Sequence, residues 1–270
     1  MSKLLVKPRA GDGMVARITP ESAGWGYVGF ELHRLNPGQT VAAKTGSKEV
    51  CLVFITGRGA ARADGENFGS LGERMSVFQG APWSLYVPQD SEWSVTAETN
   101  LELAVCQAPG LGGGLPARVI GPEDVKQEVR GKGTNTRYVT NILPEGEPAD
   151  SLLVVEVITP GGHTSSYPPH KHDRDDLPRE SYLEETYYHR IEPPQGFAFQ
   201  RVYSDAGEDG ARELDESMAV QDGDVVLVPK GYHPCAAAHG YDLYYLNVMA
   251  GPKRIWRFNT EPAHRWLLQA

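Results

Sequence analysis

The chain alternates short apolar runs with turns rich in glycine and proline. β-Branched and aromatic residues dominate the runs, and turn sequences such as Asn36-Pro37-Gly38 separate them. Many short strands divided by turns predict an all-β protein of sandwiches or barrels. The expected strands lie at 25–35, 40–43, 49–55, 75–78, 83–87, 93–96 and 101–107 in the first half, and at 151–158, 197–203, 219–228, 241–249 and 254–258 in the second.

Two segments interrupt this β pattern. Residues 109–115 (PGLGGGL) are predicted to form a flexible joint. Residues 122–130 (PEDVKQEVR) have an early proline and acidic residues in the first turn, which predicts one short linking helix. The chain is therefore expected to divide into an N-terminal barrel, 1–115, and a C-terminal barrel, 116–270.

The two halves look like copies of one plan. Residues 49–57 resemble 185–191, and 87–93 resemble 228–233. Histidines of the second copy have no counterpart in the first, where Thr45 and its neighbours replace a His-x-His and Trp93 lies near the place of His233. We therefore expect two similar barrels, of which the C-terminal one binds a metal.

Composition excludes several classes of partner. The formal net charge is −9 over 270 residues, and no basic patch offsets it, so we expect no binding to nucleic acid or anionic membranes. The three cysteines have no metal-type spacing and indicate reduced thiols in the cytoplasm. No apolar segment is long enough to suggest a signal peptide or membrane span.

The densest metal-ligand chemistry lies at residues 168–190. His170 and His172 are two apart, so on an extended strand both imidazoles leave the same face. His233 follows a Pro-x-Gly turn far downstream. Three imidazoles and one carboxylate would bind a divalent transition metal such as Zn, Mn, Fe or Ni and leave room for a substrate.

The acidic ligand has three candidates, Glu180, Glu184 and Glu185. We favour Glu185, because it opens an apolar strand and matches Glu49 in the internal repeat. Glu184 ranks second and Glu180 third.

Two short motifs resemble those of the cupin superfamily. Residues 223–233 (GDVVLVPKGYH) resemble the second cupin motif, although they are one residue short before the histidine. His170-Lys171-His172 resembles the start of the first motif, but its glutamate comes later than usual. Residues 173–184 are therefore interpreted as an insertion beside the site. One hypothesis is that this insertion acts as a lid.

Longer stretches resemble the 5-deoxy-glucuronate isomerases of bacterial inositol breakdown. The similarity covers essentially the whole chain and rests on 165–173, 187–190, 195–203 and 244–252. It implies a bicupin, two β-sandwich or jelly-roll barrels, that converts 5-deoxy-D-glucuronate to 5-dehydro-2-deoxy-D-gluconate. A related cupin isomerase acts on 5-keto-4-deoxyuronate. The implied partner is a small sugar acid, and a homo-oligomeric state is left open.

An aldose–ketose isomerisation needs a Lewis acid, a proton-transfer group and a cation for the substrate carboxylate. If Glu185 faces the metal, strand alternation places Tyr187 on the same face. Arg201 and Lys230 lie on or beside predicted site strands. We assign Tyr187 and Lys230 to catalysis, and Arg201 and Tyr245 to substrate binding.

Two other functions compete with the isomerase. One is a cupin dioxygenase that uses iron in a similar ligand set. The other is a bicupin that binds or stores a sugar without catalysis. Turnover of a uronate-type aldose without oxygen would separate the isomerase from both.

Overall fold

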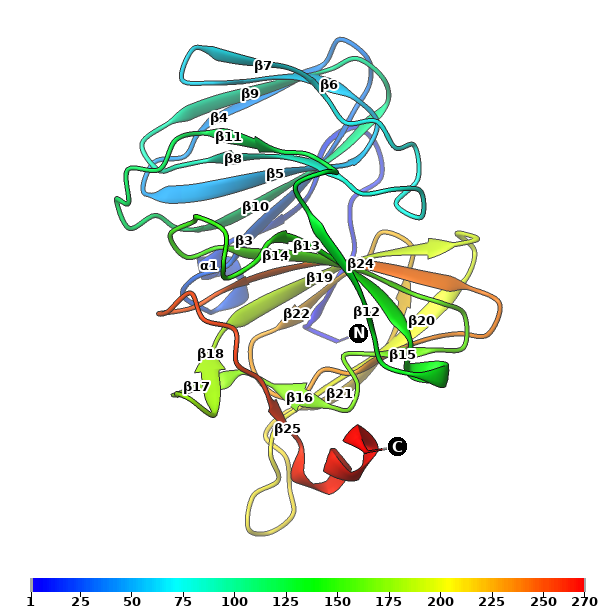
Figure 1. The fold of residues 1–270 in the computed structure, drawn as a ribbon. Helices are drawn as coiled ribbons and strands as arrows, with labels where there is room; N and C mark the ends of the chain where they lie inside the picture. Colours follow the sequence, from blue (N-terminus) through cyan, green and yellow to red (C-terminus); the bar gives the residue numbers. More distant parts are fainter. Residues whose placement is uncertain (1, 270) are drawn as a thin grey trace.

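Two β-sandwiches are stacked on each other in the computed structural model, which describes residues 2–269 (Figure 1). The N-terminal sandwich pairs a six-stranded sheet, in the order β11-β8-β5-β10-β3-β2, with a four-stranded sheet, β4-β9-β6-β7. Its strands are β2 (Gly13–Ile18), β3 (Gly29–Leu35), β4 (Thr40–Lys44), β5 (Lys48–Thr56), β6 (Gly59–Ala63), β7 (Glu66–Leu71), β8 (Trp83–Val87), β9 (Glu92–Ala97), β10 (Leu101–Pro109) and β11 (Arg118–Ile120).

The C-terminal sandwich pairs a seven-stranded sheet, β1-β22-β19-β24-β14-β13-β12, with a four-stranded sheet, β15-β23-β20-β21. Its strands are β1 (Leu5–Val6), β12 (Lys126–Arg130), β13 (Arg137–Leu143), β14 (Leu153–Thr159), β15 (Thr164–Ser165), β19 (Glu184–Glu192), β20 (Phe197–Tyr203), β21 (Asp215–Gln221), β22 (Val225–Val228), β23 (Cys235–Ala237) and β24 (Asp242–Ala250).

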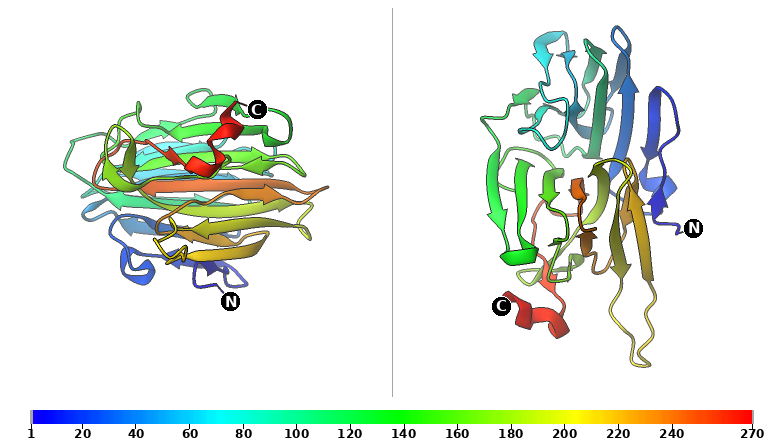
Figure 2. Two further views of the ribbon diagram at one scale, coloured as in Figure 1. Left: turned by 90° about the horizontal axis from the view of Figure 1, so that it is seen from below. Right: turned by 90° about the vertical axis from the view of Figure 1, so that its right-hand side faces the viewer.

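Small elements decorate this frame. Two-stranded sheets form from β16 (His170–Lys171) with β25 (Asn259–Thr260), and from β17 (Asp173–Asp176) with β18 (Glu180–Tyr182). The helical elements are α1 (Pro20–Ala23), η1 (Gly133–Asn135) and η2 (Pro262–Leu268). η2 lies at the end of the molecule away from the N-terminal sandwich (Figures 1 and 2). Of the helices within residues 2–269, none combines the length and apolar character of a membrane span.

The two large sheets pack face to face between the sandwiches. On β5, Leu52 and Phe54 face the core of their own sandwich, whereas Cys51 and Val53 join a second core shared with the C-terminal sheet. The strand is buried on both faces, which explains its unbroken apolar run. The predicted all-β fold of two barrels is confirmed.

Matching hydrogen-bond registers relate the two sandwiches. β5 pairs with β8 so that Val50 lies opposite Val87, and β19 pairs with β22 so that Glu185 lies opposite Val228. Each of these valines on β8 and β22 precedes a proline. Glu185 therefore corresponds to Val50, and the sequence alignment of Glu185 with Glu49 was wrong by one residue.

Glu49 and Glu184 are the true counterparts, and each ties one sandwich to the other. Glu184 accepts hydrogen bonds from the backbone N–H groups of residues 26, 27 and 28, just before β3. Glu49 accepts hydrogen bonds from those of residues 150, 151 and 152, just before β14. Both carboxylates thus satisfy three backbone donors in the opposite half of the chain.

The sandwiches also exchange edge strands. Leu5 and Val6 of β1 pair with Val226 and Val225 at one edge of the C-terminal sheet. In return, β11 pairs with β8 of the N-terminal sheet. A domain boundary at 115 remains a proposal, and it would leave each sandwich with one strand from the other segment.

The predicted linking helix at 122–130 was wrong. Residues 122–124 form a turn, and β12 pairs along its whole length with β13, from Lys126 opposite Asn141 to Arg130 opposite Arg137. Tertiary pairing outweighs the local helix signal here.

Candidate metal centre

A small cavity inside the C-terminal sandwich contains most of the candidate site residues. Its volume is about 30 Å³, which suits an ion or a water. The lining residues come from β12, β13, β14, β19, β24 and the segments around them: Arg130, Arg137, Val139, Val155, Val157, Ser166, His170, His172, Glu185, Tyr187, Tyr245, Asn247 and Trp256.

Backbone carbonyls fix the orientation of three imidazoles. His172 Nδ1 donates to the carbonyl oxygen of Leu183 at 3.0 Å, and His233 Nδ1 donates to that of Gly231 at 2.8 Å. His170 Nδ1 is 3.3 Å from the carbonyl oxygen of Pro168. A carbonyl only accepts, so each Nδ1 carries the proton and each Nε2 presents a lone pair. This is the usual outer-shell arrangement of metal-binding histidines.

Glu185 lies between two of these lone pairs. Its Oε2 is 3.2 Å from His172 Nε2 and 3.3 Å from His233 Nε2, and all three side chains are buried. Their ligand atoms lie within 4.8 Å of one another. His233 Nε2 is buried without a hydrogen-bond partner among the described residues. These residues fit a divalent metal ion, which would occupy that unsatisfied lone pair.

His170 is adjacent to this group but outside it. Its ring centroid is 5.1 Å from that of His233 and 6.5 Å from that of His172, and it packs against the tilted ring of Phe258 at a centroid distance of 4.6 Å. Burial lowers the pKa of both His170 and His233 to about 3. Both imidazoles are therefore neutral at pH 7, as metal ligation requires. Burial also acts to lower the pKa of His172, but the hydrogen bond and the charge of Glu185 together outweigh it and raise the pKa. Without a metal, His172 Nε2 can therefore carry a second proton and donate it to Glu185 Oε2, and a bound metal would replace that proton.

The other two acidic candidates point elsewhere. Glu184 faces the opposite side of the sheet, where it accepts the three N–H groups described above. Glu180 accepts from the backbone N–H of Asp173 at 2.8 Å and lies 3.7 Å from Lys171 Nζ. Of the three glutamates, the fold brings Glu185 to the histidines.

The insertion at 173–184 forms the β17–β18 hairpin, and it braces the histidine-bearing turns. Asp173 accepts a hydrogen bond from Gly231 N at 2.8 Å. It also forms an ion pair with Lys171 Nζ at 2.8 Å. The N–H of Leu183 donates to the carbonyl oxygen of His172 at 2.8 Å. These bonds join the segment before Glu185 to both His172 and the turn that carries His233.

Two tyrosines line the cavity beside Glu185. The hydroxyl of Tyr187 is 2.8 Å from Ser166 Oγ, and that of Tyr245 is 2.5 Å from Ser165 Oγ. Burial raises the pKa of both phenols, so they stay protonated at neutral pH. Ser166 has a φ of 49°, an uncommon backbone conformation for serine that is often found at functional sites.

Arg201 and Lys230, predicted to serve the substrate and the reaction, do not line the cavity. Arg201 forms a two-point ion pair with Asp215 at 2.8 and 2.7 Å. On β20 the alternating neighbours Ala198, Gln200 and Val202 are buried, so Arg201 faces outward. Lys230 Nζ is 2.7 Å from Glu213 and borders a separate surface hollow.

Sequence reasoning missed two arginines and an asparagine on the cavity wall: Arg130, Arg137 and Asn247. Assigning 122–130 to a helix removed Arg130 from consideration. The available signal was Gly131-Lys132-Gly133, a glycine-rich turn between two segments that contain valine and arginine, which is typical of a hairpin.

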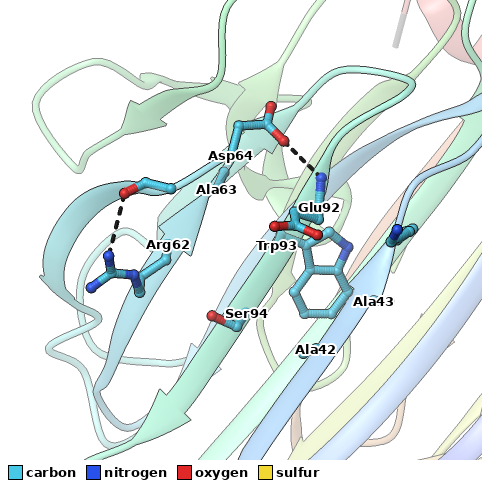
Figure 3. Close-up of a pocket in the computed structure, with 10 residues that line it drawn as sticks. Ala42, Ala43, Arg62, Ala63, Asp64, Glu92, Trp93 and Ser94 are labelled. Carbon is cyan, nitrogen blue, oxygen red and sulfur yellow. Dashed lines mark hydrogen bonds between the residues drawn. The ribbon is translucent and has the colours of Figure 1, made fainter.

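A larger hollow, of about 420 Å³, lies on the N-terminal sandwich (Figure 3). Trp93 packs there beside Ala42 and Ala43, and Asp64 accepts a hydrogen bond from the backbone N–H of Glu92 at 2.8 Å. The ten described residues that line it include no histidine or cysteine. The hollow therefore offers much poorer transition-metal chemistry than the cavity in the C-terminal sandwich.

Comparisons with known proteins agree along the whole chain. A protein named 5-deoxy-glucuronate isomerase from Geobacillus thermodenitrificans is 55% identical over 260 residues, which are 96% of this chain and 93% of that protein. The crystal structure of an IolB-like protein from Salmonella typhimurium matches with a TM-score of 0.95 and 52% identity, over 99% of this chain and 100% of that one.

A mutant of Bacillus subtilis oxalate decarboxylase matches with a TM-score of 0.61 and 14% identity, over 96% of this chain and 80% of that one. At this identity the likeness concerns the bicupin fold alone. The model of the KduI/IolB family matches residues 4–267. The chain belongs to the KduI/IolB family.

Proposed function

We propose that this protein is a 5-deoxy-glucuronate isomerase that converts 5-deoxy-D-glucuronate to 5-dehydro-2-deoxy-D-gluconate. Relatives that carry this enzyme name are 55% and 53% identical over nearly the whole chain. The observation that carries the proposal is the position of Glu185, whose Oε2 lies 3.2 and 3.3 Å from two imidazole nitrogens whose rings are held by backbone carbonyls. A place in myo-inositol breakdown and a cytoplasmic location are parts of the proposal, and the three free cysteines support the latter.

The proposed ligands are His170, His172, Glu185 and His233. A divalent metal bound there would supply a Lewis acid for the carbonyl and the adjacent hydroxyl of the sugar. The backbone acceptors hold the three rings in place before metal binds. Metal binding therefore costs little side-chain entropy, because the rings already have the required orientation. The β17–β18 hairpin likewise restrains His172 and the turn that carries His233, through its hydrogen bonds to both.

In the enediol route to the ketose, protons move at both oxygens and both carbons of the aldehyde end, and a hydride shift between the two carbons is the alternative route. Tyr187 keeps its phenolic proton at neutral pH, and Ser166 Oγ lies 2.8 Å from it. The pair is suited to hold a proton at a substrate oxygen and pass it on, rather than to remove one from carbon. Tyr245 and Ser165 form a second hydroxyl pair on the neighbouring strand β24.

The decisive experiment follows 5-deoxy-glucuronate by NMR under argon with the purified protein, alongside measurement of its metal content. We expect conversion to the ketose without oxygen, loss of activity after chelation, and recovery with added divalent metal. Oxygen consumption in place of anaerobic turnover would support the dioxygenase instead. Binding without any turnover would support the sugar-binding bicupin.

Variants of single residues test whether the reaction takes place in this cavity. His172→Ala should lose metal and activity while the circular dichroism spectrum stays unchanged. The exposed His239 is the matched control, and His239→Ala should keep both. Tyr187→Phe should retain metal but reduce kcat by roughly 10²- to 10⁴-fold, the usual effect of losing a proton-transfer group.

A further inference from the structure

Two arginines lie directly opposite each other in the β12–β13 hairpin. Arg130 pairs with Arg137 in the antiparallel register, so their side chains leave the same face of the sheet. Both side chains line the cavity that contains the candidate metal ligands. Like charges in directly opposed positions destabilise a β-ladder. This arrangement therefore has a cost that the fold alone does not explain.

The two arginines differ in how their charge is compensated. Arg130 donates from Nε to Glu128 Oε1 at 2.9 Å, and its guanidinium lies 5.5 Å from the ring centroid of Trp256. Within residues 2–269, Arg137 forms no ion pair, and its guanidinium donates only to the backbone carbonyl of Asn135, at 3.0 Å. Arg137 thus presents a charge without an anionic partner.

Among the described residues that line the cavity, no carboxylate is free to neutralise this charge. Glu185 is the one carboxylate among the described lining residues, and it is already shared by His172 and His233. Burial lowers the pKa of Arg137, and the charge of Arg130 adds to this effect. The guanidinium stays protonated at neutral pH, because arginine starts from a very high pKa. The wall of the site formed by β12 and β13 is therefore positive.

The hairpin loop holds Arg137 in place. Gly131 has a φ of 80°, and a Cβ there would lie 2.0 Å from the carbonyl oxygen of Asn135 and 2.7 Å from Arg137 Nη1. Asn135 Nδ2 also donates to the carbonyl oxygen of Tyr167 at 3.1 Å, close to His170 in the chain. The guanidinium is thus fixed relative to the candidate metal ligands before any ligand enters.

We propose that Arg137, with Arg130 beside it, binds the carboxylate of the sugar-acid substrate and so selects uronates over neutral aldoses. This inference rests on the proposed isomerase function, because it assigns the far end of that substrate. A guanidinium without a protein carboxylate offers two parallel N–H donors to a ligand carboxylate. Arg201, the candidate chosen from sequence, already donates two such hydrogen bonds to the carboxylate of Asp215.

The test compares two sugars that differ at one carbon. D-Glucuronate has a carboxylate where D-glucose has a hydroxymethyl group, so calorimetric titration of the purified protein with each isolates recognition of that group. We expect wild type to favour glucuronate and Arg137→Met to weaken glucuronate binding by about 10- to 100-fold, as for loss of charged hydrogen bonds. Glucose binding and metal content should stay unchanged. Arg201→Met, which removes the same charge outside the cavity, should bind as wild type.

Kinetics with 5-deoxy-glucuronate provide the second readout. Arg137→Met should raise KM far more than it lowers kcat, and Arg137→Lys should recover part of the loss, because lysine keeps the charge without the fork. The lysine variant also decides the question if the methionine variant does not fold, since its KM should exceed that of wild type at normal metal content.

Three outcomes overturn the proposal: wild type that does not favour glucuronate, Arg137 variants that bind glucuronate as wild type, or variants that weaken glucose equally. The proposed function fails separately, when wild type converts no 5-deoxy-glucuronate. The comparison of glucuronate with glucose still tests Arg137 in that case.

Discussion

Glu184 and Glu185 are neighbours on β19 whose side chains leave opposite faces of the sheet, and replacing each one separates stability from metal binding. Glu184 Oε1 accepts Gly26 N–H at 2.6 Å, and Oε2 accepts Tyr27 and Val28 N–H at 2.7 and 3.1 Å. In Glu184→Gln an NH₂ group replaces one of these oxygens. It cannot accept, so at least one backbone donor loses its partner.

The size of the effect follows from that lost acceptor. An unsatisfied buried donor costs about 1–3 kcal/mol in unfolding free energy. For a chain of this size each kcal/mol lowers Tm by about 2–4 °C, which gives roughly 2–12 °C for Glu184→Gln. Glu185→Gln should instead reduce metal content, because its carboxylate lies beside His172 and His233.

Thermal unfolding after chelation and elemental analysis of the metal-loaded protein measure the two effects. Glu192→Gln, at the exposed end of the same strand, is the control for loss of a charge. We expect Glu184→Gln to lower Tm but keep its metal, and Glu185→Gln to lose metal with a smaller change in the Tm of the chelated protein. If Glu184→Gln has the Tm of the control and loses metal, the assignment of the two faces is wrong.

Three further predictions concern single side chains. Burial lowers the pKa of His189 to about 4, whereas an unfolded histidine binds its proton near pH 6.5, so this residue should remove up to about 3 kcal/mol of stability as the pH falls from about 6.5 to 4. His189→Gln should flatten that part of the pH dependence of urea unfolding of the chelated protein, and an unchanged slope would contradict the argument. Arg74→Met leaves the buried Glu156 without its two-point partner at 2.9 and 2.8 Å and should cost about 3–5 kcal/mol by urea unfolding, with partial recovery on adding Glu156→Gln. Gly231→Ala would place a Cβ 2.3 Å from a backbone carbonyl and disturb the acceptor of His233, so metal affinity should fall about tenfold or more in a competition titration, and wild-type affinity would refute this.

Most strands were predictable because local and tertiary signals agree in them. β5, β10 and β24 are apolar runs ended by turns, and their burial on two faces needs no polar alternation. The failure at 122–130 has the opposite cause. Its proline and acids favour a helix locally, but β13 provides a pairing edge, and Val129 remains exposed on the resulting strand. The sequence of 122–130 alone does not show that β13 offers an unpaired edge to which this segment can bind.

The site residues also differ in whether the local sequence predicts them. The histidines followed from their spacing and from the resemblance to known motifs, since those signals are local. The choice of Glu185 rested on an alignment that was one residue out, and on a strand one residue decides which face a side chain occupies. Arg137 had no local signal, because its importance depends on the absence of a nearby carboxylate and on the strand opposite, which only the folded chain reveals.

The exchange of edge strands has a consequence for synthesis of the chain. Residues 5–6 leave the ribosome long before their pairing partners at 225–226 are made. The N-terminal sheet, in contrast, acquires its last strand as soon as 118–120 emerge. β1 is therefore made early and placed late, and a nascent chain with a finished first sandwich still carries β1 without its partner strand. β1 can pair at the edge of the C-terminal sheet only after β22 has been made. A chain in which this edge is paired has therefore already been translated through both sandwiches.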